Sequence, residues 1–180
     1  MLAKCQCILI RLENVLVRIA AASLFLIMLI VVADVLMRYI FNSPFIWSYE
    51  LIAMYLMVIV FFFSLSNTLE EDGHIAVDIL HIKLSSRSRH WCLAIGYWLT
   101  LIVFTIILCT SINETWISYK HDDVTDGLIE WPIWLSWLSV PLGVALLNIR
   151  ILFRALGHTL SAVLNQPVIA LPLISGHEKE

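Results

Sequence analysis

Four long apolar segments constrain the fold of this chain more than any other feature. The expected membrane spans are residues 19–40, 47–69, 91–113 and 131–152. Each approaches or exceeds the roughly 20 residues that a helix needs to cross a hydrocarbon core of about 30 Å. Of the 180 residues, 61% are hydrophobic and only 14% are charged, whereas about a quarter of an ordinary soluble domain is charged. The sequence therefore predicts an all-α integral membrane protein, with four transmembrane helices in a single membrane domain, 1–180.

Three other segments flank or join these spans. Residues 1–18 place apolar side chains at helical spacing among basic ones, which predicts a cytoplasmic amphipathic lead-in lying on the membrane surface. Residues 74–85 are too short and too polar to span, and they predict an interfacial helix between the second and third spans. Residues 158–180 predict a cytoplasmic tail.

The positions of Lys and Arg predict the orientation. All but two of the 11 basic residues lie before the first span, between the second and third spans, or on the C-terminal side, where Arg150 is near the end of the fourth span; the exceptions are Arg38 and Lys120. Because cytoplasmic loops are enriched in Lys and Arg, we expect both termini in the cytoplasm and the acidic loop 114–130 outside. Arg87 and Arg89 are expected to contact phospholipid headgroups. A net charge of -3 without a basic tract predicts no nucleic-acid binding.

The turn between the first two spans carries charges in apolar surroundings. Asp34 and Arg38 stand four residues apart, so they share one helical face and can neutralise each other. The short turn 42–44 brings Glu50 to nearly the same depth, beside the interfacial aromatic ring of Trp47. We therefore expect a three-charge cluster. Its role is open between a structural clamp, a docking point for a partner and an ion or proton site.

A second polar set lies in the expected interfacial helix. His74, Asp78 and His81 share one face of it, and this spacing could hold a metal ion. Polar side chains on the wet side of an interfacial helix explain the same pattern, and we favour that interpretation. His74 and Asp78 are thus expected to be structural or partner-docking residues, and no metal site is predicted.

Several function classes lack the residues that they need. A haem or quinone subunit requires ligands within its helices, yet all six histidines fall outside the predicted spans. No nucleophile motif accompanies an acid and base pair, so we expect no catalytic residue, no cofactor and no enzyme activity. A complete secondary transporter would show an inverted repeat, which is missing here. An accessory transporter subunit remains, with a homo-oligomeric four-helix channel or a membrane anchor as the alternative.

One set of residues is similar to a known family. The set comprises Asp34-x3-Arg38-Tyr39-x-Phe41-Asn42-x-Pro44-x2-Trp47-x2-Glu50, Gly73-His74-Ile75-x-Val77-Asp78, Pro132-x-Trp134 and Pro141-Leu142-Gly143. Across about residues 10 to 157 the chain resembles the small membrane subunit of the tripartite ATP-independent periplasmic (TRAP) transporters.

This resemblance implies a place in a bacterial inner-membrane complex. In that family a large membrane subunit carries the substrate and sodium sites. A soluble periplasmic binding protein delivers an organic acid, such as a C4-dicarboxylate or a sialic acid. The resemblance implies that this chain acts mainly as a scaffold beside the large subunit.

Overall fold

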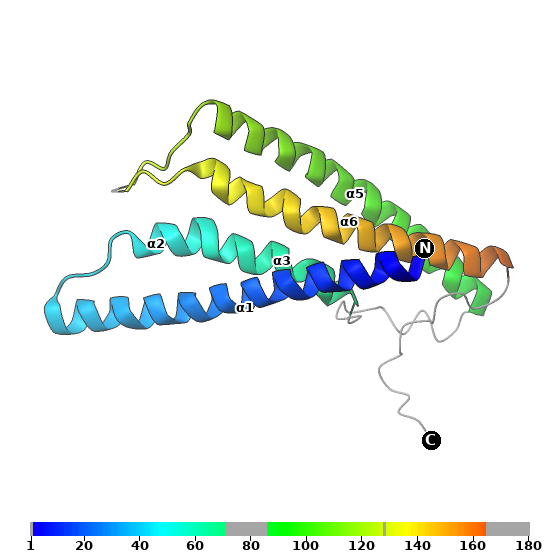
Figure 1. The fold of residues 1–180 in the computed structure, drawn as a ribbon, viewed down its shortest axis with the longest axis horizontal. Coiled ribbons are helices and arrows are strands. Elements are labelled where there is room, and N and C mark those ends of the chain that lie inside the picture. Colours follow the sequence, from blue (N-terminus) through cyan, green and yellow to red (C-terminus); the bar gives the residue numbers. More distant parts are fainter. Residues whose placement is uncertain (1, 71–85, 128, 165–180) are drawn as a thin grey trace, which may run out of the picture.

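The computed structural model describes residues 2–70, 86–127 and 129–164, and these residues are mostly helical (Figure 1). The helices are α1 (Leu2–Phe41), α2 (Ser48–Glu50), the π-helical turn η1 (Leu51–Leu56), α3 (Met57–Glu70), α5 (Ser86–Lys120) and α6 (Ile133–Leu164). The elements α2, η1 and α3 follow one another without a break. Within the described residues, four helical stretches are long and apolar enough to cross a membrane: Ile8–Phe41, Ser48–Leu69, Arg87–Lys120 and Ile133–Leu164. The predicted all-α fold with four spans is confirmed.

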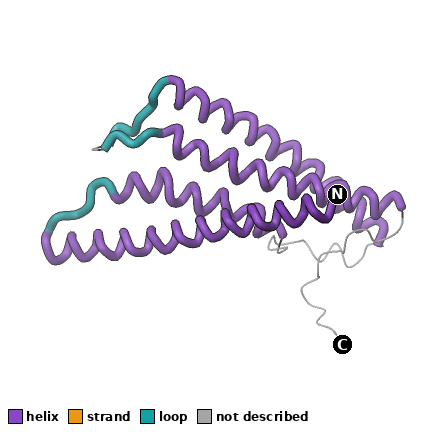
Figure 2. Tube along the Cα trace, viewed as in Figure 1, coloured by secondary structure: helices purple, strands orange, loops and turns teal. Residues whose placement is uncertain are grey.

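The helices form two hairpins. In hairpin 1, α1 packs against α2, η1 and α3; in hairpin 2, α5 packs against α6; and α3 packs against α6 to join the two (Figure 1). The loops that close the two hairpins lie at the same end of the molecule (Figure 2). A small apolar core of Leu69, Leu147 and Ile151 lies in the joint between the hairpins.

Gly143 brings α3 and α6 close together in this joint. A Cβ atom at this position would lie 2.3 Å from the backbone oxygen of Phe62. Since real Cβ atoms do not approach a carbonyl oxygen so closely, α3 can reach its position only because residue 143 has no side chain. The glycine is therefore required by packing, in the way that small residues permit close contact between membrane helices.

Two of the predicted boundaries differ from the structure. No break occurs at residue 18, because the expected lead-in is the beginning of the single helix α1. The predicted tail 158–180 begins within a helix, since α6 continues to Leu164. Hydropathy marks only the part of a helix that is apolar enough for lipid, whereas a helix continues as long as its backbone hydrogen bonds and its side-chain packing persist. The expected interfacial helix 74–85 lies outside the described residues.

Candidate functional site

Asp34 connects the end of α1 to the turn that follows it. Its Oδ2 lies 3.1 Å from Arg38 Nη2, so the predicted ion pair of these two residues is confirmed. Its Oδ1 accepts a hydrogen bond of 2.7 Å from the backbone N–H of Phe45. The Arg38 side chain is 67% exposed, whereas that of Asp34 is 15% exposed. Asp34 therefore fixes the turn, while Arg38 extends toward the surroundings.

Glu50 does not join this pair, so the predicted three-charge cluster is wrong. Its carboxylate packs instead against Gly127 in the loop between α5 and α6, where an added Cβ would lie 1.8 Å from Oε1. Its Oε2 is buried and has no hydrogen-bond partner among the described residues. The sequence predicts that Glu50 lies at nearly the same membrane depth as Arg38, but it does not predict which neighbour the Glu50 side chain faces. Glu50 contacts the loop of hairpin 2.

A buried ion pair occurs at the other end of the bundle, between α1 and α6. Arg150 Nε donates a 3.0 Å hydrogen bond to Glu13 Oε1, and Arg150 Nη2 also pairs with Glu13 Oε2. The hydroxyl of Ser66 on α3 donates to Glu13 Oε1. The side chains of Glu13 and Arg150 are only 2% and 7% exposed. We call Glu13, Ser66 and Arg150 the inter-hairpin clamp, because they join helices of both hairpins.

Two histidines meet within hairpin 2. The Nδ1 atoms of His90 on α5 and His158 on α6 are 3.1 Å apart, and the residues are 4% and 0% exposed. The ring of Tyr97 stacks on His158 with a centroid distance of 5.5 Å. Both histidines lie within the helical stretches that are long and apolar enough to span, Arg87–Lys120 and Ile133–Leu164, whereas the expected spans 91–113 and 131–152 exclude them. Two axial haem ligands would need the iron between them, so rings in direct contact do not make that site.

The comparison with protein families decides the identity of this chain. The family described as "Tripartite ATP-independent periplasmic transporters, DctQ component" matches residues 27–161. The chain belongs to this DctQ family. No curated protein and no solved structure matched it. Together with the four spans, the family makes the chain a small membrane component of a TRAP transporter and a multi-pass protein of the inner membrane.

The other residues singled out in this DctQ chain occupy different places. Trp47 is partly buried and stacks on Phe45, with ring centroids 5.5 Å apart. Arg87 is exposed at the start of α5. Arg89 is partly buried, and its Nε has no hydrogen-bond partner among the described residues. His74 and Asp78 lie outside the described part of the chain. The expected lipid and partner contacts of all these residues stay predictions.

The sequence analysis of this DctQ chain did not predict the inter-hairpin clamp, although one feature of the sequence points to it. Glu13 is the only acidic residue before Asp34, and it stands between two apolar stretches. An isolated acid of this kind in a membrane helix is costly unless it is paired. The partner, Arg150, is 137 positions away. Sequence spacing could have shown that Glu13 needs a cation, but not which one.

Proposed function

We propose that this chain is the accessory scaffold subunit of a sodium-driven, binding-protein-dependent TRAP transporter. In this proposal it works beside a large membrane subunit, which carries the substrate and sodium sites, and a periplasmic binding protein. The substrate class is an organic acid such as a C4-dicarboxylate or a sialic acid. The family match over residues 27–161 carries this proposal.

The arrangement of charged groups supports a scaffold rather than a transport pathway. Glu13 and Arg150 neutralise each other in a buried contact between helices. Asp34 pairs with Arg38 and accepts a hydrogen bond from the turn after α1. Ionisable groups on a transport route would instead converge on a substrate or ion. Within the described residues, no group of three or more His, Cys, Asp or Glu side chains could hold a metal ion.

Co-purification in mild detergent tests the partner part of the proposal. An affinity tag on this chain, expressed from its native genetic context, is expected to recover a large multispanning protein in a fixed ratio. Proteoliposomes that contain only this chain are expected to show no uptake of labelled dicarboxylate or sialic acid with or without a sodium gradient. Proteoliposomes that contain the recovered complex and the binding protein serve as the positive control.

Two results would contradict the scaffold role. One is a homogeneous homo-oligomer that conducts ions when reconstituted alone, which is the behaviour of a channel. The other is sodium-dependent uptake of an organic acid by this chain without its partners. Uptake by the full complex that persists without a sodium gradient would contradict sodium as the coupling ion, but it would not contradict the scaffold role.

A further inference from the structure

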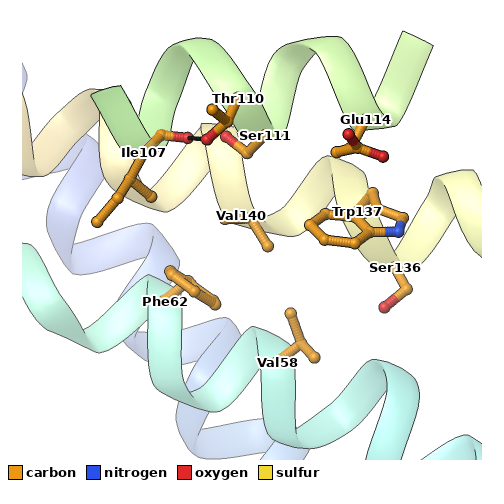
Figure 3. Close-up of a pocket in the computed structure, with 9 residues that line it drawn as sticks. All are labelled: Val58, Phe62, Ile107, Thr110, Ser111, Glu114, Ser136, Trp137 and Val140. Carbon is orange, nitrogen blue, oxygen red and sulfur yellow. Dashed lines mark hydrogen bonds between the residues drawn. The ribbon is translucent and has the colours of Figure 1, made fainter. Parts of the chain in front are cut away.

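An apolar groove lies between the two hairpins near their loop ends. It has a volume of about 560 Å³ and is lined by α3, α5 and α6. The lining residues are Val58, Phe62, Ile107, Thr110, Ser111, Glu114, Ser136, Trp137 and Val140. Figure 3 shows Glu114 and Trp137 at one end and Ile107 at the other, with Val58 and Phe62 across from them. Its volume is within the range of about 300–1,000 Å³ of sites that hold a ligand.

The hydroxyl groups along this groove already donate hydrogen bonds to backbone carbonyl oxygens of the protein. Thr110 Oγ1 donates to Ile106 O at 3.0 Å, and Ser111 Oγ donates to Leu108 O at 3.0 Å. Ser136 Oγ donates to Met54 O on the opposite hairpin. These side chains therefore offer an occupant few directional contacts. The groove is an apolar trough with one charged group at its end.

That charged group is Glu114, whose side chain is exposed. Among the residues that the structure describes, Glu114 forms no ion pair. Rings of the interfacial type surround this level of α5 and α6: Trp116 and Tyr119 are 6.3 Å apart, and Tyr119 and Trp134 are 5.5 Å apart. Trp and Tyr gather at the level of lipid headgroups. The carboxylate is thus at the depth where a headgroup would meet it.

The shape of the groove distinguishes between two kinds of cation. From Glu114 to Ile107 it extends about 10 Å along α5, at about 1.5 Å per residue. A Lys or Arg from a partner protein has a stem of only three or four carbons, so it would fill only the part next to the carboxylate. A phospholipid with an ammonium headgroup has both a cation for Glu114 and an acyl chain long enough for the rest.

We propose that this groove is a binding site for a phospholipid with a primary ammonium headgroup, phosphatidylethanolamine. The ammonium group donates charge-assisted hydrogen bonds to Glu114. One acyl chain occupies the trough between α3, α5 and α6 and fills the gap between the hairpins. The bound lipid then fixes the distance between the two hairpins at their loop ends. This proposal requires only that the chain is in a bilayer, so it is independent of the proposed transporter partners.

Lipid binding to the full-length chain, purified in mild detergent with whatever partner accompanies it, tests the proposal. The probes are phosphatidylethanolamine and phosphatidylglycerol with identical acyl chains. The readouts are bound lipid by native mass spectrometry and the rise in Tm on lipid addition. Phosphatidylethanolamine is expected to bind more tightly. Glu114→Gln should weaken it by roughly tenfold, the size expected for loss of a hydrogen bond to a charged group.

Three further variants make the test specific. Glu130→Gln removes an exposed acid that is not part of the groove, and it should bind both lipids as the unsubstituted chain does. Glu114→Lys should reverse the preference in favour of the anionic phosphatidylglycerol. Val58→Phe fills the trough, so it should reduce binding of both lipids without changing their order.

Equal binding of the two lipids to the unsubstituted chain would overturn the proposal. So would a Glu114→Gln variant that binds phosphatidylethanolamine as well as Glu130→Gln does. If Glu114→Gln keeps its lipid but loses a co-purifying membrane protein, the occupant at Glu114 is that protein and the lipid assignment is wrong. Failure to find any large partner would contradict the proposed function while leaving the lipid measurements valid.

Discussion

Glu13 on α1 and Arg150 on α6 are separated by 137 positions in the sequence, and their side chains form a buried ion pair. Ser66 on α3 donates to the same carboxylate. One contact thus joins α1 and α3 of hairpin 1 to α6 of hairpin 2. At the other end of the bundle, Ser136 donates to Met54 O, and the hydroxyl of Tyr55 donates to Pro132 O at 2.7 Å.

Removal of Arg150 is expected to destabilise the bundle strongly. Arg150→Met leaves the Glu13 carboxylate buried without its counter-charge, and breaking a buried pair from one side costs about 3–5 kcal/mol. The measurement is the Tm of the full-length chain in detergent. Adding Glu13→Gln to Arg150→Met should recover part of the loss, because the remaining side chain is neutral. No recovery in the double variant would show that the charge of Glu13 is not what Arg150 neutralises.

Removal of Arg38 is expected to have a much smaller effect. The Arg38 side chain is 67% exposed, and exposed ion pairs contribute about 0–1 kcal/mol. Asp34 also keeps its hydrogen bond from Phe45 N when Arg38 is replaced. Arg38→Ala should therefore lower the Tm less than Asp34→Ala, which frees the turn as well. A larger loss in Arg38→Ala would mean that Arg38 has an additional partner in the assembled complex.

Substitution of Gly143 is expected to separate α3 from α6. Even Gly143→Ala places a Cβ 2.3 Å from Phe62 O, and relieving such overpacking typically costs about 1–3 kcal/mol. Gly96→Ala is the matched control, because a Cβ there meets nothing within 4 Å. Thermal unfolding in detergent compares the two variants. Equal Tm values for both would contradict the close approach of α3 and α6.

Gly127 and Glu50 are expected to behave as a coupled pair. Gly127→Ala introduces a Cβ that meets the Glu50 carboxylate, which is the end of a flexible side chain, so this carboxylate should move aside and the Tm should fall slightly. In a Glu50→Ala background the same glycine substitution should be nearly neutral, since the obstructing carboxylate is absent. A double-mutant cycle of Tm values gives the coupling. Additive effects would show that Glu50 and Gly127 do not touch.

Thiol labelling tests the predicted orientation. In a variant whose four native cysteines are replaced, single cysteines are placed at the exposed positions 87 and 122. With a membrane-impermeant reagent on intact cells, position 122 should react and position 87 should react only after the cells are opened. This result follows from the enrichment of Lys and Arg in cytoplasmic loops. The opposite pattern would invert the topology.

The sequence was sufficient for the features that depend on local spacing. The four spans follow from the length of the apolar segments, and the Asp34–Arg38 pair follows from a separation of one helical turn. Both depend on residues that are close in the chain. The family resemblance rested on four short motifs along the chain and is confirmed by the match over residues 27–161.

The contacts between helices could not be predicted in this way. Residues 1–18, which include Glu13, were expected to lie on the membrane surface, yet the rotation of α1 turns the Glu13 side chain toward Arg150. Glu50 was paired with Arg38 by depth, but its position around the helix axis directs it to Gly127. His90 and His158 meet because both helices extend past their apolar parts. Each case depends on helix rotation and helix ends, which hydropathy does not report.

The inter-hairpin clamp also sets an order on the biogenesis of this protein. A ribosome synthesises Glu13 long before it reaches Arg150, so a nascent chain that ends before α6 has an acid with no counter-charge. Hairpin 1 can enter the bilayer early, but its inner end is completed only when the last helix arrives. A truncated chain therefore holds the Glu13 carboxylate in a membrane helix without the cation that it pairs with in the finished protein, which is a costly arrangement.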